Sequence, residues 1–184
     1  PNGENWVFRI NTSSGREITA VAVTQPNKSR TGPTWSYVFE NLGTNTVDVG
    51  SPGSFESLKD GYKTAGIDLA DVTDVIVTHG HSDHDGTIPE FMEESDSRLK
   101  AHEAYDLLKA FRSWDIQDFS ATVLQRELTA IGKKRIDKET FNHRATRDEE
   151  YYRLRKLTKV TSRLLEGDNI GDMRVLSTPG HSPD

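Results

Sequence analysis

Residues 74–86 of the chain read Asp-Val-Ile-Val-Thr-His-Gly-His-Ser-Asp-His-Asp-Gly. The run from Asp74 to Thr78 is short, apolar and β-branched, which is typical of a buried strand. Three histidines and an aspartate follow within six residues, and these histidines are half of the six in the chain. The stretch therefore predicts a buried strand that ends in a cluster of metal-binding side chains.

The spacing of these side chains predicts two cation sites on one loop. His79 and His81 are two residues apart in extended backbone, so both project from one face and can bind one cation. Asp83 and His84 follow where the chain turns into a helix, so they point elsewhere and can bind a second cation. The chain has no cysteine, and imidazole with carboxylate suits zinc best and also iron or manganese.

Composition restricts the other classes of function. The 184 residues carry a formal net charge of −6, which disfavours nucleic acid or an anionic membrane surface as a partner. No apolar run approaches the ~20 residues that a membrane span requires. The first 20 residues also lack the apolar core of a secretory signal. A cytoplasmic location fits the absence of cysteine.

The residues on both sides of the histidine loop predict an α/β layered domain. Apolar and β-branched runs between clusters of Gly, Asn, Ser and Pro predict strands. These runs are Trp6–Ile10, Glu17–Thr24, Trp35–Glu40, Thr46–Val49 and Arg98–Ala101. One helix is expected over Ser54–Ala65, with Ser54 as N-cap and a stop at Gly66, and another from near Gly86 to Glu94.

The segment from Arg112 to Leu165 differs from the rest of the chain. Its apolar residues follow helical spacing without a β-rich run, and its basic residues outnumber its acidic ones. We expect two or three helices that form a wall or lid beside the metal site. Its aromatic residues, among them Trp114, Tyr151 and Tyr152, are expected to pack in a core rather than to line a pocket.

The loop from His79 to His84 resembles the HxHxDH motif of the metallo-β-lactamase-fold hydrolases, the glyoxalase II-like and β-lactamase-like superfamily. Two further motifs match in order, Asp48 in Thr-Val-Asp-Val-Gly and His181 in Thr-Pro-Gly-His-Ser-Pro. The resemblance spans nearly the whole chain. It implies a single domain over residues 1–184, the N-terminal part of an αββα sandwich, with a helical insert at about 112–165.

The same resemblance implies roles for individual residues. His79, His81 and His181 are implied as ligands of a first metal, and Asp83 with His84 as ligands of a second. Asp48 is implied to accept the spare N–H of a ligand histidine. The family adds a bridging Asp and a last His farther along, so the chain is expected to lack the C-terminal part, to hold about one metal tightly and to have little hydrolytic activity by itself.

Chemically, the resemblance implies hydrolysis by a metal-activated hydroxide at two divalent metals, with zinc as the first candidate. Asp83 is the candidate catalytic residue that orients the hydroxide and moves a proton, and a pure ligand role has equal weight. The expected substrate is a small molecule with an acyl bond, namely a thioester, ester, lactone or lactam. The alternatives are a nucleic-acid phosphodiesterase, an iron-dependent sulfur dioxygenase and an inactive metal-binding fragment. An uncovered sheet edge leaves a homo-oligomer open.

Two polar residues near the motif have structural predictions. Asp85 precedes Gly86, so it is expected to cap the helix that follows. His102 follows a predicted strand and opens the sequence Ala-His-Glu-Ala-Tyr, so it is expected to cap a helix as well.

Overall fold

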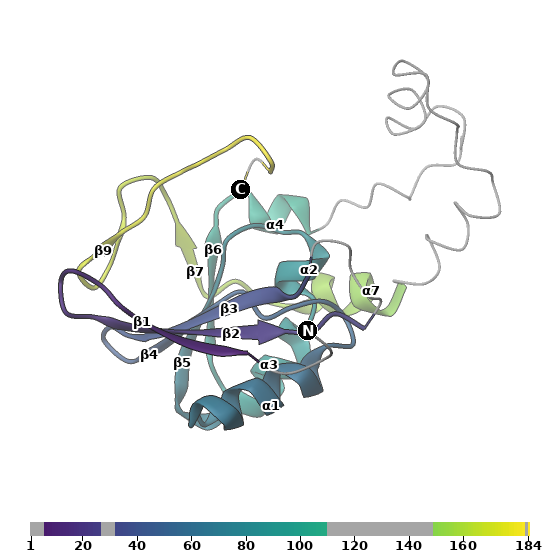
Figure 1. Ribbon diagram of the computed structural model, residues 1–184. Helices are drawn as coiled ribbons and strands as arrows, with labels where there is room; N and C mark the ends of the chain where they lie inside the picture. Colours follow the sequence, from purple (N-terminus) through teal and green to yellow (C-terminus); the bar gives the residue numbers. More distant parts are fainter. Residues whose placement is uncertain (1–5, 27–31, 110–148, 183) are drawn as a thin grey trace, which may run out of the picture.

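The computed structural model describes residues 6–26, 32–109, 149–182 and 184, and a seven-stranded sheet forms its centre (Figure 1). The strands are β1 (Val7–Asn11), β2 (Glu17–Val23), β3 (Thr34–Glu40), β4 (Thr44–Val47), β5 (Val72–Val77), β6 (Arg98–His102) and β7 (Ser162–Leu164). Their spatial order follows their order in the chain. Neighbours from β1 to β4 pair antiparallel, and neighbours from β4 to β7 pair in parallel.

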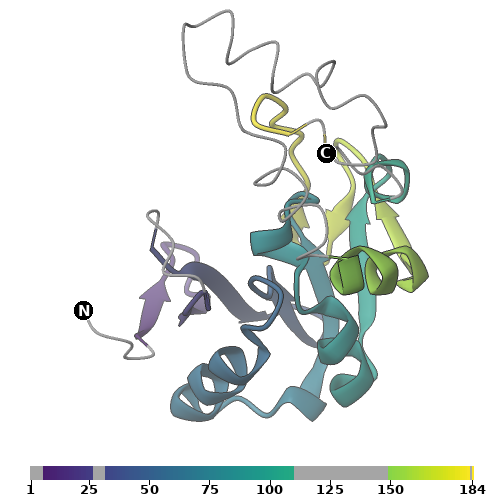
Figure 2. The ribbon, with the colours of Figure 1, turned by 90° about the vertical axis from the view of Figure 1, so that its right-hand side faces the viewer.

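Helices connect the parallel strands, and α1 and α3 lie on the same side of the sheet (Figure 2). The helical elements are α1 (Phe55–Ala65), the 3-10 turn η1 (Leu69–Asp71), α2 (Ser82–Asp85), α3 (Ile88–Ser95), α4 (Tyr105–Leu108) and α7 (Glu149–Leu157). α1 packs on β2, and α3 contacts η1 and α7. None of the helices in the described ranges has the length and apolar character that crossing a bilayer requires.

The hydrophobic core lies between the sheet and these helices. Val21, Val75 and Leu99 come from three different strands, are fully buried, and cluster with Leu58 and Tyr62 of α1. Because side chains alternate between the two faces of a strand, one face of each strand supplies the core. The α/β fold class expected from the sequence is therefore confirmed.

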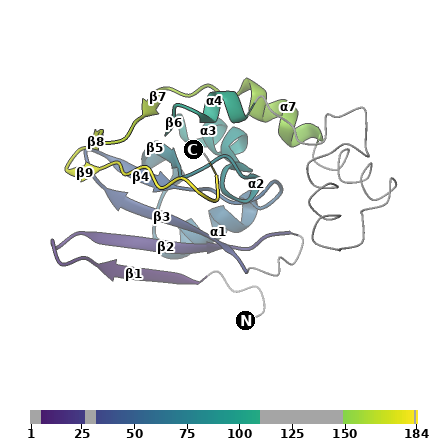
Figure 3. The same ribbon diagram turned by 90° about the horizontal axis from the view of Figure 1, so that it is seen from above.

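The other face of the sheet, away from the core, carries apolar side chains that are more exposed than those of the core face. Phe8 and Tyr37 both pair with Ala20, so they share this face, and both are exposed. The C-terminal segment, which contains the hairpin of β8 (Asn169–Ile170) and β9 (Met173–Arg174), passes over part of it (Figure 3). Between this segment and the sheet lies a cavity of about 270 Å³ that Ile76 and Leu176 help to line.

The bounds of α1 agree closely with the prediction from the sequence, whereas those of β4 do not. α1 begins after Ser54 and ends at Gly66, which has a left-handed backbone with φ 75°. The Ser54 hydroxyl donates to the Ser51 carbonyl at 2.7 Å and does not cap the helix. Strand β4 ends at Val47, two residues earlier than predicted, because Asp48 leaves the extended conformation with φ 56°.

The prediction that the Arg112–Leu165 segment is helical is wrong at its C-terminal end. α7 is a helix, but β7 follows it and pairs in parallel with β6. The backbone N–H of Thr161 donates to the Leu99 carbonyl at 2.8 Å, so residues 161–164 pair with the otherwise free edge of β6. Pairing with that edge overrides the helical spacing of the apolar residues. Residues 112–148, with the prediction for Trp114, lie outside the described residues.

Gly61 lets α1 approach the sheet closely. An ideal Cβ at this position would lie 2.4 Å from Cγ1 of Val21, which is fully buried and has no room to shift. We expect Gly61→Ala to lower the free energy of unfolding by about 1–3 kcal/mol, the usual cost of overpacking, despite the better helix propensity of alanine. Urea denaturation measures this loss. Lys63→Ala, at an exposed position of the same helix, is the control, and equal stability of the two variants would contradict the close packing.

Candidate metal centre

The histidine loop connects β5 to α2, and hydrogen bonds from two neighbouring segments hold it in place. The backbone N–H of Val49 donates to the His84 carbonyl at 2.8 Å, and the N–H of Gly86 donates to the Gly50 carbonyl at 2.8 Å. The hydroxyl of Thr34, at the start of β3, donates to the Asp83 carbonyl at 2.7 Å. The loop therefore has a defined shape at the edge of the sheet.

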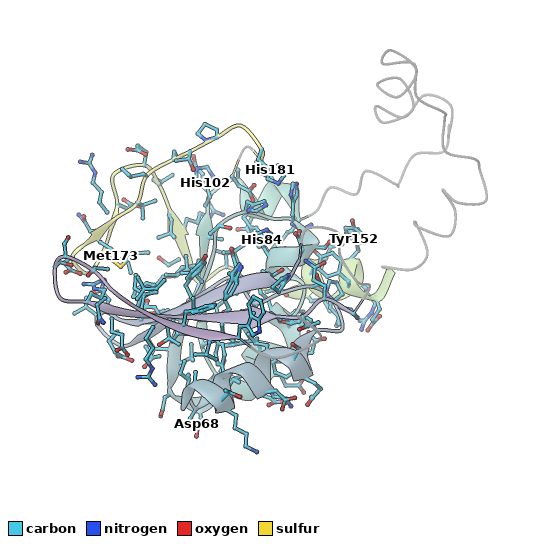
Figure 4. The ribbon with its side chains drawn as sticks, in the orientation of Figure 1. Asp68, His84, His102, Tyr152, Met173 and His181 are labelled. Carbon is cyan, nitrogen blue, oxygen red and sulfur yellow. The ribbon has the colours of Figure 1, made fainter. Side chains whose placement is uncertain are left out.

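Three histidines from two distant parts of the chain converge at this loop. One ligand nitrogen from each of His79, His81 and His181 lies within 4.8 Å of the others. The ring centroids of His79 and His81 are 4.6 Å apart, and those of His81 and His181 are also 4.6 Å apart. Figure 4 shows His181, on the C-terminal segment, close to His84 and far from Asp68 at the other end of the molecule.

The chemistry of this cluster fits a divalent cation. The Nε2 atom of His79 is buried and has no hydrogen-bond partner among the described residues. A buried polar atom without a partner is costly, and a cation placed among the three rings would supply one. Three imidazoles with an open position form a sufficient ligand set for zinc, and iron and manganese accept the same donors.

Asp83 and His84 adjoin this cluster. The His84 ring centroid is 4.1 Å from that of His79, and His84 Nε2 is 3.6 Å from Asp83 Oδ2. The Asp83 side chain is 45% exposed, so its carboxylate faces solvent at the edge of the loop. These two residues offer an imidazole and a carboxylate to a second cation next to the first.

Asp48 organises two of the histidines. Its Oδ2 atom lies 2.8 Å from His84 Nδ1, and it also accepts the Thr78 hydroxyl at 2.8 Å. The Thr78 hydroxyl in turn lies 3.0 Å from His79 Nδ1. With the protons on Nδ1, both histidines keep a free lone pair on Nε2. Thr78 carries no prediction from the sequence, although its position directly before His79 is the signal that identifies it.

The surroundings shift the pKa values of His79 and His84 in opposite directions. Burial, together with His84 and His81, lowers the pKa of His79, so its ring stays neutral and able to bind a metal. Burial also disfavours protonation of His84, but the hydrogen bond and the charge of Asp48 outweigh it and raise the pKa. Asp48 is the largest of three carboxylate contributions to this rise, ahead of Asp83 and Asp85.

We expect Asp48→Asn to lower the pKa of His84 in metal-free protein, because the amide keeps the shape of the carboxylate and removes its charge. An NMR titration of the histidine ring protons measures this shift. Asp83→Asn is the control, since Asp83 contributes less to the pKa of His84 than Asp48 does. An unchanged His84 titration in the Asp48 variant would contradict the assigned role of Asp48.

The prediction that Asp85 caps the next helix is wrong. Thr87 occupies the N-cap of α3, whereas Asp85 is the last residue of α2 and is 1% exposed. Its carboxylate accepts the hydroxyls of Tyr105 at 2.8 Å and Tyr151 at 2.5 Å, and it lies 2.8 Å from Nε of Arg155. Burial raises the pKa of Asp85, and Arg155 and the two tyrosines oppose that rise.

Two predictions about residues outside the loop have clear outcomes. The prediction that His102 caps a helix is wrong, because Ala104 occupies the N-cap of α4; Nδ1 of His102 accepts the backbone N–H of Ala104 at 3.1 Å in the turn before that helix. Tyr151 is buried, so it packs in the interior as expected, but its hydroxyl also binds a residue of the metal loop.

The sequence matches the metallo-beta-lactamase superfamily over residues 30–184. A protein from Xenopus laevis, Metallo-beta-lactamase domain-containing protein 1, is 49% identical over 45 residues. These residues are 24% of this chain and 19% of the relative. The local identity is therefore high, and the shared segment is short.

Solved structures share the fold. BJP-1, a subclass B3 metallo-beta-lactamase of Bradyrhizobium japonicum, is 22% identical with a TM-score of 0.55, covering 89% of this chain and 50% of its own. The metallo-beta-lactamase GOB-18 from Elizabethkingia meningoseptica is 17% identical with a TM-score of 0.58, covering 100% of this chain and 56% of its own. This chain spans about half the length of both enzymes. Because the superfamily match covers most of the chain and the fold agrees, the chain belongs to the metallo-beta-lactamase superfamily.

Proposed function

We propose that this chain carries the metal centre of a hydrolase that cleaves an acyl bond in a small molecule. The superfamily has a metal-dependent hydrolase fold. The convergence of His79, His81 and His181, with a buried Nε2 that lacks a partner among the described atoms, is the observation that carries the proposal. Zinc is the first candidate for the metal, because three imidazoles without thiolate suit it.

The ligand residues would hold the metal in a fixed position. A divalent metal bound there lowers the pKa of a coordinated water toward ~7 and polarises the carbonyl group under attack. His79, His81 and His181 would donate ring nitrogens, and Asp83 and His84 would serve a second cation at the adjoining position. Asp48 would hold the proton of His84 on Nδ1 and, through the Thr78 hydroxyl, that of His79 as well, which leaves both Nε2 atoms to the metals.

Asp83 is the candidate for proton transfer. Its carboxylate is partly exposed beside the histidine cluster, so it can accept a proton from a water that attacks the substrate. In this role Asp83 Oδ2 would orient the water and then pass the proton to the leaving group. Asp83 could instead act as a metal ligand alone, with the same geometry. The effect of Asp83→Asn on turnover, measured at equal metal content, separates proton transfer from metal ligation.

A hollow of about 310 Å³ beside Asp83 and His84 supports a small-molecule substrate. Trp35 and Tyr37 supply an aromatic wall to this hollow. Its volume lies at the lower end of the range for small-molecule sites. An apolar group of an ester, thioester, lactone or lactam can pack against this wall while its carbonyl group lies beside Asp83 and His84.

A panel of substrates tests the proposal. The chain, loaded with zinc, is assayed with a thioester, a lactone, a β-lactam and a phosphodiester, beside His81→Ala as the control. We expect weak, metal-dependent turnover of at least one acyl substrate, because the second cation position is incomplete, and we expect the loss of this turnover in the variant. Turnover confined to the phosphodiester would contradict the acyl assignment, and equal rates in both proteins would contradict catalysis at this metal centre.

A further inference from the structure

Arg155 reaches from α7 into the interior behind the histidine loop. Its side chain is only 6% exposed, and Nη2 donates to the Gly80 carbonyl at 2.7 Å. Nε lies 2.8 Å from Asp85 Oδ2, and the guanidinium group lies over the rings of Tyr105 and Tyr151, 5.4 and 5.7 Å from their centroids. The buried guanidinium group of Arg155 therefore contacts the histidine loop and its following residue Asp85 at two separate points.

The first point of contact is the residue between two candidate ligands. Gly80 separates His79 from His81 in the sequence, and both its backbone N–H and its carbonyl form hydrogen bonds with side chains. Its carbonyl accepts from Arg155, and its N–H donates to Asp184 Oδ2 at 2.7 Å. The approach is so close that a Cβ at Gly80 would lie 2.4 Å from Nη2 of Arg155.

The second point of contact directly follows another candidate ligand. Asp85 comes after His84, and its two carboxylate oxygens are engaged by Tyr105, Tyr151 and Arg155. A buried arginine and a buried carboxylate are stable only when each meets the other and nearby polar groups. Asp85 accepts both tyrosine hydroxyls, and its Oδ2 forms an ion pair with Arg155 Nε at 2.8 Å, although that nitrogen lacks hydrogen-bond geometry to any described atom.

The two contacts of Arg155, at Gly80 and Asp85, lie next in sequence to the candidate ligands His79, His81 and His84. Arg155 bonds the residue that links His79 to His81, and it pairs with the residue after His84. A shift of this guanidinium group would move the Gly80 carbonyl between His79 and His81 and the Asp85 side chain next to His84. Groups that orient metal ligands in this way typically change metal affinity 10- to 100-fold when they are replaced.

We propose that Arg155 is a positioning residue of the metal centre, which fixes Gly80 and Asp85 so that the imidazoles of the loop face a shared cation. The proposal rests on the metal site described under the proposed function and extends it to a residue about 70 positions away in the chain. α7 thus takes part in metal binding through Arg155 without supplying a ligand.

Binding of Co²⁺ to the full 184-residue chain tests this role, because the visible absorption of Co²⁺ reports the geometry of its ligands. Arg155→Lys keeps a positive charge near Asp85, but an ammonium group lacks the fork that reaches Asp85 and the Gly80 carbonyl together. Gly80→Ala places a Cβ 2.4 Å from the present position of Nη2, so the guanidinium group must move away, and it leaves every charge in place. Arg153→Lys is the matched control, since Arg153 is exposed on the same helix and pairs with Glu150.

We expect Arg155→Lys and Gly80→Ala to bind Co²⁺ roughly 10- to 100-fold more weakly than the unaltered chain, with a changed absorption spectrum. Arg153→Lys should match the unaltered chain in both respects. Urea denaturation in EDTA measures the stability of each variant separately from its metal affinity. If Arg155→Lys does not fold, the Co²⁺ affinity and spectrum of Gly80→Ala test the proposal.

The outcomes separate the positioning role from the metal site itself. Unchanged affinity and spectrum in both variants, with or without a loss of stability, would overturn the positioning role and leave Arg155 a purely structural residue. Failure of the unaltered chain to bind Co²⁺ would overturn the proposed metal site and the role of Arg155 with it. Weaker binding in Arg153→Lys as well would show a general effect of α7 and also overturn the specific assignment.

Discussion

Replacement of His79 or His81 by alanine is expected to weaken zinc binding by at least about 10- to 100-fold. Replacing a residue that merely hydrogen-bonds to a metal ligand already causes a loss of that size, so removal of a ligand itself should cost no less. Each variant removes one of the three imidazoles that converge within 4.8 Å, so two remain to hold the cation. Two neutral ligands bind zinc far more weakly than three, because tetrahedral sites with an open position rely on three protein ligands.

Competition with a chromophoric chelator measures the change in affinity. His102→Ala is the control, because the ring of His102 accepts a backbone N–H near α4 and lies outside the histidine cluster. If His79→Ala and His81→Ala retained the zinc affinity of the control, the first metal site would be assigned to the wrong residues.

The second large effect is expected on stability. Asp85→Ala should lower the free energy of unfolding by about 3–5 kcal/mol, because it leaves the buried Arg155 without a counter-charge. It also leaves the hydroxyls of Tyr105 and Tyr151 without their acceptor. Urea denaturation in EDTA isolates this loss from any contribution of bound metal.

Two further variants identify the cause of that loss. Asp172→Ala removes an exposed carboxylate that pairs with Arg16, so it should cost much less. Asp85→Ala combined with Arg155→Met should recover part of the stability, because the uncompensated charge is gone as well. A loss of the same size in Asp85→Ala and Asp172→Ala would show that the buried network contributes little.

Short-range patterns in the sequence predicted the parts of the site that depend on local geometry. His79 and His81 are two residues apart after a strand, and the structure places their rings 4.6 Å apart. His181 is about 100 residues away in the chain, so spacing alone could not bring it to the loop. Only the resemblance to the metallo-β-lactamase fold indicated that it belongs there.

The network around Asp85 could not be predicted because its partners come from elements far apart in the sequence. Tyr105 lies on α4, whereas Tyr151 and Arg155 lie on α7. A carboxylate next to a glycine gives a strong local signal for a helix cap, and nothing near it indicates a buried cation. The same limit explains β7, where the edge of β6 decides the conformation of a segment with helical spacing.

Calorimetric titration of the metal-free chain with zinc, beside His181→Ala, tests the central claim that His79, His81 and His181 form one divalent metal site. We predict about one tightly bound zinc per chain, since three imidazoles converge there while, among the described residues, the adjoining position offers Asp83 and His84 alone. In His181→Ala that tight binding should disappear. Tight binding that persists in this variant would contradict the account, as would two equally tight sites in the unaltered chain.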